Sequence, residues 1–73
     1  MKCYMEICYT YEAREHTKSF FPPIAIVEVE AKEHEVFKTL ADKALDKIRK
    51  KYPEKTIYMI DYRYLGNDIE IIK

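Results

Sequence analysis

Alternating apolar and polar positions predict four strands, at about residues 2–12, 24–31, 55–64 and 69–72. In 2–12 every odd position from Cys3 to Tyr11 is apolar or aromatic, while the even positions mix Tyr, Glu, Cys and Thr. Residues 24–31 are apolar on one face along their whole length and on both faces only at their start. In 55–64 strict alternation places four large side chains on one face, namely Tyr58, Ile60, Tyr62 and Tyr64.

A different period predicts one amphipathic helix at about residues 33–52. Apolar residues recur there at the i, i+3 and i+4 spacing of a single helical stripe. Lys, Arg and Asp occupy the opposite side, and Pro53 stops the helix because the residue before a proline is biased away from helical geometry. The stripe consists of Val36, Phe37, Leu40, Ala41, Ala44, Leu45, Ile48 and Tyr52.

Together these elements predict a single α+β domain spanning residues 1–73, with the order ββαββ. We expect a mostly antiparallel sheet of strand order 2-1-3-4, because one helix can then cover the centre of one face. Residues 13–23 are expected to form a long loop, and Gly66-Asn67-Asp68 a hairpin turn into the last strand. The pattern leaves open which sheet face the helix covers, and whether 69–72 pairs within the chain or with another chain.

Composition and charge exclude several protein classes. The chain has 73 residues, 48% apolar and 36% charged, which is too apolar for disorder and too charged for a membrane protein. Lys2 and Glu6 interrupt the N-terminal apolar positions, so no secretory signal is predicted and a cytoplasmic location is expected. Thirteen basic and thirteen acidic residues give a net charge of zero, which argues against general nucleic-acid binding.

The sequence carries no pattern of catalytic or metal-binding residues, and we expect neither an enzyme nor a bound cofactor. Cys3 and Cys8 are five positions apart, so on one strand they face opposite ways, too far apart for a disulfide or a shared metal ion. We therefore expect free thiols. His16 and His34 are expected to be surface residues, and one glycine in the whole chain excludes a phosphate-binding Gly-rich loop.

The strand tyrosines are the leading candidate for a binding surface. Three exposed aromatic rings would exceed the apolar patch that most monomers tolerate, since each buries about 150–250 Å². Both faces of the sheet look apolar, and one helix can cover only one of them. We therefore expect a non-catalytic interaction or regulatory module that forms a homodimer through Tyr4, Tyr58, Ile60, Tyr62 and Tyr64. On size alone, it could serve as an inhibitor or accessory protein of a mobile element.

Two other function classes remain open at this level. The strand tyrosines could stack the bases of single-stranded nucleic acid, with phosphates held by Arg49, Lys50, Lys51 and Arg63. Alternatively, a ligand pocket or an enzyme site could form only at a dimer interface, around Glu6, Glu28 or His16. No stretch of the sequence resembles a known family in specific residues.

Overall fold

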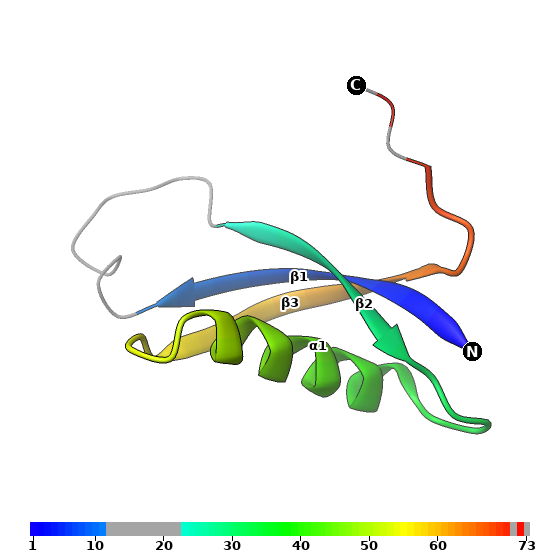
Figure 1. Ribbon diagram of the computed structural model, residues 1–73, viewed down its shortest axis with the longest axis horizontal. Helices are drawn as coiled ribbons and strands as arrows, with labels where there is room; N and C mark the ends of the chain where they lie inside the picture. The colour runs from blue at the N-terminus through cyan, green and yellow to red at the C-terminus, as the bar shows by residue number, and fades with distance from the viewer. Residues whose placement is uncertain (12–22, 71, 73) are drawn as a thin grey trace.

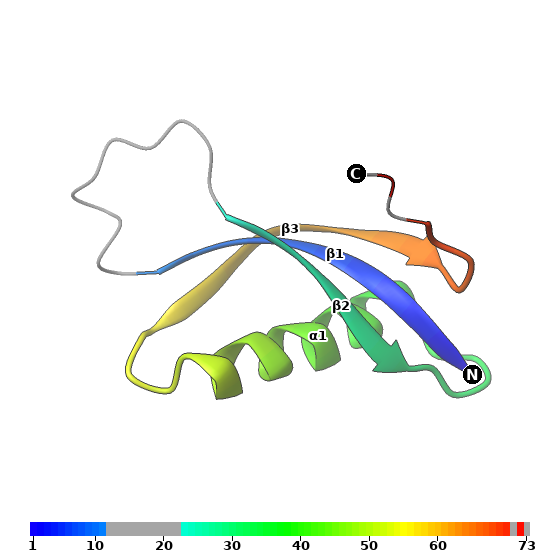
Figure 2. The same cartoon turned by 45° about the horizontal axis from the view of Figure 1, so that its top comes forward.

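The protein is a three-stranded antiparallel sheet with one helix on one face, as Figures 1 and 2 show. The structure is a computed structural model that describes residues 1–11, 23–70 and 72. The elements follow the order β1, β2, α1, β3, with β1 at the centre of a β2-β1-β3 sheet. Their bounds are β1 Lys2–Tyr11, β2 Ile24–Glu30, α1 Phe37–Lys51 and β3 Ile57–Gly66.

The predicted four-stranded ββαββ fold is wrong, because the arrangement is β-β-α-β. The relative order of the first three strands agrees with the prediction. Beyond β3, however, residues 67–70 and 72 form no strand and Gly66-Asn67-Asp68 no hairpin. The outer edge of β3 is a poor template for a fourth strand. Two irregularities in the pairing of β3 with β1 bend the strand, and the Arg49 guanidinium already donates a hydrogen bond to the carbonyl of Ile57 at 3.0 Å.

The helix begins at Phe37, four residues later than the predicted start at residue 33 and one residue after the first apolar position of its stripe. A tight turn precedes it: the amide of Glu35 donates to the carbonyl of Lys32 at 3.3 Å, and His34 adopts a positive φ of 68°. Val36 is then extended (φ −82°, ψ 158°) and caps α1 without a side-chain hydrogen bond. At the other end, Tyr52 leaves helical geometry just before Pro53, as predicted. In the described ranges no helix is long and apolar enough to cross a membrane.

The helix covers the odd-numbered face of β1. Cys3, Met5 and Ile7 have no exposed surface there, and Tyr9 is also buried. They pack with the apolar stripe of the helix and with Val29 and Ile57 from the two outer strands. The helix contributes Leu40, Ala41, Ala44, Leu45 and Ile48.

Two irregularities in β3 change which of its residues face the helix. Tyr9 pairs with Met59, but the next residue of β1, Cys8, pairs with Asp61, so Ile60 is an extra residue in β3. A second shift leaves Leu65 without a partner in β1, because Met5 pairs with Tyr64 and Tyr4 with Gly66. Each extra residue reverses the alternation of the strand that follows. Strict alternation therefore predicts the correct face for the residues of β3 only up to Ile60.

Candidate protein-binding face

The sheet face that α1 leaves uncovered, here called the open face, is built from the even-numbered residues of β1 and their cross-strand partners. Directly paired residues lie on the same face. The pairing therefore aligns them in rows across the strands: Ile24–Cys8–Asp61, Ile26–Glu6–Arg63, Glu28–Tyr4–Gly66, Thr10–Tyr58 and Glu30–Lys2. The rows divide the open face into an apolar end and a charged end.

The apolar end carries four large exposed side chains, which we call the apolar patch. They are Ile24 (62% exposed), Ile26 (47%), Tyr58 (47%) and Ile60 (56%). The half-buried thiol of Cys8 lies on the central strand between them. The patch is gathered by the sheet from β2 and β3, which are separated by the whole helix in the sequence.

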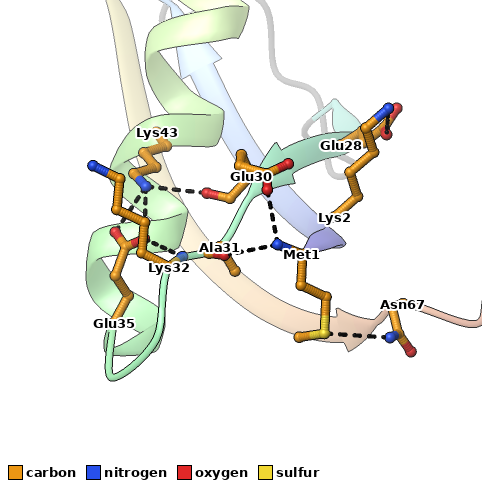
Figure 3. A network of polar contacts seen from close by, with 9 residues as sticks. All are labelled: Met1, Lys2, Glu28, Glu30, Ala31, Lys32, Glu35, Lys43 and Asn67. Carbon is orange, nitrogen blue, oxygen red and sulfur yellow. Dashed lines mark hydrogen bonds and ion pairs between the residues drawn. The ribbon is translucent and has the colours of Figure 1, made fainter.

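The charged end carries ion pairs of both signs. The Arg63 guanidinium lies 3.0 Å from a carboxylate oxygen of Glu6, and the Lys2 ammonium lies 3.6 Å from one of Glu28. The amino group of Met1 contacts the carboxylate of Glu30 at 2.7 Å (Figure 3). This hydrogen bond to the amino group lowers the pKa of Glu30 below its ordinary value. These pairs are solvent-exposed, so each adds little to stability.

The structure separates the five residues predicted to share a partner-binding face. Tyr4, Tyr58 and Ile60 lie on the open face. Tyr62 pairs with Ile7, however, and Tyr64 with Met5, so both tyrosines lie on the helix side and pack against the core. The Tyr64 ring stacks on Phe37 with 4.6 Å between centroids and 11° between planes. Strict alternation misplaced them because a bulge leaves no clear mark in this sequence.

The cations predicted to bind nucleic acid are also separated. Arg63 is on the open face, paired with Glu6. Lys50 and Lys51 are on α1, behind the opposite face, and Arg49 donates to the carbonyl of Ile57. No continuous basic track therefore joins these four residues to Tyr58. The two tyrosines that would have extended a base-stacking platform face the helix instead.

The cysteines lie on opposite faces and are free, as predicted. Burial raises the pKa of the Cys3 thiol, which makes its reactive thiolate harder to form. Cys8 is half-buried on the open face. The described residues hold no group of three or more His, Cys, Asp or Glu side chains that could bind a metal ion. Glu6 and Glu28 are in ion pairs, and His16 lies outside the described residues.

A feature that the sequence reasoning missed is a pair of helix lysines on the free edge of β2. The ammonium of Lys43 donates to the carbonyl of Glu30 at 3.0 Å and contacts the carboxylate of Glu35 at 2.8 Å (Figure 3). One helical turn later, Lys47 donates to the carbonyl of Glu28 at 2.5 Å. The i, i+4 spacing of the two lysines was visible, but not their position beside β2.

Comparison with models of known protein families finds no match, and searches of curated proteins and of solved structures find no significant match.

Proposed function

We propose that this chain is a protein-interaction module whose partner, a second copy of the same chain, packs on the apolar patch of the open face. The observation that carries the proposal is the exposure of Ile24, Ile26, Tyr58 and Ile60 together on a sheet face that none of the described helices and strands covers. A sheet buries both faces when a second layer is added to the free one. The proposal replaces the five-residue set predicted from the sequence by these four side chains.

Size and charge favour a second copy over another partner. A chain of 73 residues buries only about 60% of its unfolded surface, and association is a common way for such a small domain to gain core. The formal net charge is zero, so two copies do not repel one another at long range. The charged end of the open face presents both signs, through Arg63 and Lys2 beside Glu6 and Glu28, which suits a self-complementary contact.

The dimensions of the sheet predict a weak dimer. Three strands of up to ten residues form a face of roughly 14 by 34 Å, on the order of 500 Å². Stable interfaces bury about 800 Å² on each partner. We therefore expect a dissociation constant in the micromolar range or above.

Sedimentation equilibrium from about 10 to 500 µM tests the proposal, a range that spans the dissociation constants of such weak interfaces. The 8.8 kDa chain should approach twice its mass as concentration rises. Ile60→Lys should abolish this rise by placing a charge in the contact. The matched control is Ile72→Lys, because Ile72 is 85% exposed outside the sheet. A monomeric wild type throughout the range, or equal effects of the two variants, would overturn the proposal.

The Cys8 thiol supplies a second measurement within the same face. In a dimer through the apolar patch, Cys8 is covered, so its reaction with a thiol reagent should slow as protein concentration rises. Cys3 is fully buried in each copy and should react only on unfolding. A Cys8 reaction rate independent of concentration, in a protein that sediments as a dimer, would place the contact on another surface.

A further inference from the structure

A groove runs between the free edge of β2 and the C-terminal half of α1. One pocket in it has a volume of about 320 Å³, at the lower end of the range for small-ligand sites. Tyr9, Val27, Ile48 and Tyr52 are among its apolar lining, and the lysines at positions 47 and 51 also line it. A second pocket of about 370 Å³ shares Lys47 with the first and is also lined by Lys43, Asp46 and Lys50.

The groove is bordered by a row of cations. Positions 43, 47, 50 and 51 follow the helical spacing of one side of α1, and all four are lysines. Lys43 is paired with Glu35. Among the described residues, no carboxylate lies within ion-pair distance of Lys47, Lys50 or Lys51. Glu28 also lines the groove, but its carboxylate is held by Lys2 on the open face. The part of the groove beside Val27 and Tyr52 thus has Lys47 and Lys51 against Glu28, a local excess of one positive charge.

Among residues 1–11 and 23–70, side chains bond to the outer edge of β2 along only part of its length. In residues 23–31 the backbone N–H and C=O groups of the odd-numbered residues point toward β1. The Pro23 carbonyl accepts a hydrogen bond from the amide of Tyr9, and the amide of Ala31 donates to the carbonyl of Met1. The backbone groups of the even-numbered residues therefore point outward. The ammonium groups of Lys43 and Lys47 donate hydrogen bonds to two of these carbonyls, those of Glu30 and Glu28 respectively. Ile24 and Ile26 have the same parity, and no helix lysine bonds to them.

We propose that this groove binds an extended acidic peptide, which adds a strand beside Ile24 and Ile26. In such a strand, alternate side chains point to opposite faces. Those toward α1 would be carboxylates that pair with Lys47 and Lys51. Those toward the open face would be apolar and would continue the row formed by Ile24 and Ile26. The site shares Ile24 and Ile26 with the proposed dimer contact but includes neither Tyr58 nor Ile60, so it is tested at protein concentrations at which the chain is monomeric.

Fluorescence anisotropy tests the proposal with a labelled peptide of alternating valine and glutamate, four of each, blocked at both ends. The peptide should bind the full chain, and the double variant Lys47→Gln/Lys51→Gln should weaken binding about tenfold, as expected for the loss of two exposed charge pairs. The single variant Lys51→Gln, which removes no backbone contact of β2, should give a smaller loss. The matched control is Lys38→Gln, because Lys38 is on the same helix but pairs with Asp42 at 2.7 Å, away from the groove. It should leave binding unchanged.

Three comparisons decide what the groove recognises. A block peptide, in which the four valines precede the four glutamates, has the same composition without alternation, and it should bind less tightly. An oligothymidylate of eight nucleotides should also bind less tightly than the alternating peptide. At concentrations at which wild type is monomeric, the Ile60→Lys variant should bind the alternating peptide like wild type, because Ile60 is on β3, the opposite edge strand from the groove. Absence of binding, equal binding of the block peptide, or tighter binding of the oligonucleotide would overturn the proposal.

Discussion

The two faces of β1 already differ in the sequence, and the structure turns that difference into one of burial. The odd face is wholly apolar or aromatic, whereas the even face begins with Lys2 and has Glu6 and Thr10 beside Tyr4 and Cys8. On the helix side, Met5 and Ile7 are completely buried, whereas no even residue of β1 is buried. One helix is thus enough to complete one face, and the other is left to a partner or to water. We therefore expect the binding surface on the even face of β1.

The same contrast appears between two tyrosines of β3. Tyr58 is 47% exposed on the open face, while Tyr64 stacks on Phe37 on the helix side. Six residues apart, they would share a face in an uninterrupted strand. The extra residue Ile60 moves the side chains from Asp61 to Tyr64 to the face opposite the one that strict alternation predicts. The bulge therefore adds Tyr62 and Tyr64 to the helix layer and reduces the aromatic content of the open face.

The largest effect is expected from inserting one alanine between Asp61 and Tyr62, after the bulge that sets the face of these tyrosines. Residues after the insertion must then either slip in register or turn Tyr62 and Tyr64 away from the helix. We expect a loss of unfolding free energy greater than the roughly 2–5 kcal/mol of a single large core truncation. Urea denaturation followed by circular dichroism measures it. Insertion of one alanine after Glu70, an exposed residue beyond β3, is the control. Equal losses for the two insertions would contradict the placement of Tyr62 and Tyr64 on the helix side.

The next effect contrasts isoleucines on the two faces. Ile7→Ala should lower the unfolding free energy by about 2–5 kcal/mol, because Ile7 is fully buried and its truncation leaves a cavity. Ile24→Ala should change it by less than about 0.5 kcal/mol, because Ile24 is 62% exposed. Denaturation at a concentration where the protein is monomeric measures both. Similar losses for the two variants would mean that Ile24 is covered in the monomer.

A smaller effect tests the position of Tyr64. A double-mutant cycle between Tyr64→Ala and Phe37→Ala should give a coupling of about 0.5–1.5 kcal/mol, the range for stacked aromatic pairs. The same cycle between Tyr58→Ala and Phe37→Ala should give almost none, because Tyr58 lies on the other face. Equal coupling energies in the two cycles would show that Tyr58 and Tyr64 do share a face.

The smallest effect concerns the turn before α1. The hydrogen bonds that Glu35 accepts from Lys43 and from the amide of Lys32 lower the pKa of its carboxyl. Since the folded pKa lies below the unfolded one, the associated stability is present above about pH 4.5 and is lost as pH falls through the folded pKa. Glu35→Gln should reduce this acid sensitivity slightly, whereas Glu54→Gln should not. Thermal melts between neutral pH and about pH 3 compare the two variants, and identical profiles would contradict the prediction.

Much of the fold was readable from local patterns. Alternation located β1, β2 and β3 to within two residues at each described boundary, and the helical stripe located α1 apart from its start. The start was misplaced because the predicted range began at residue 33, ahead of the first apolar position of the stripe, Val36; residues Lys32–Glu35 instead form a turn, with His34 in a left-handed conformation. The fourth strand was wrong because a four-residue stretch with three isoleucines and Glu70 specifies a strand only if an edge accepts it. Of the five residues predicted for a partner-binding face, the structure has Tyr4, Tyr58 and Ile60 on the open face, and their role in binding stays a prediction.

The sequence by itself determined which side chains can be buried, because apolar periodicity follows directly from the geometry of a strand or a helix. It therefore specified the odd face of β1, the stripe of α1 and the separation of Cys3 from Cys8. Only the tertiary structure decided which surfaces remain uncovered. Register, the extra residue in β3 and the position of the helix lysines beside β2 depend on pairing between segments far apart in the chain. The open face and the groove exist only because these segments meet.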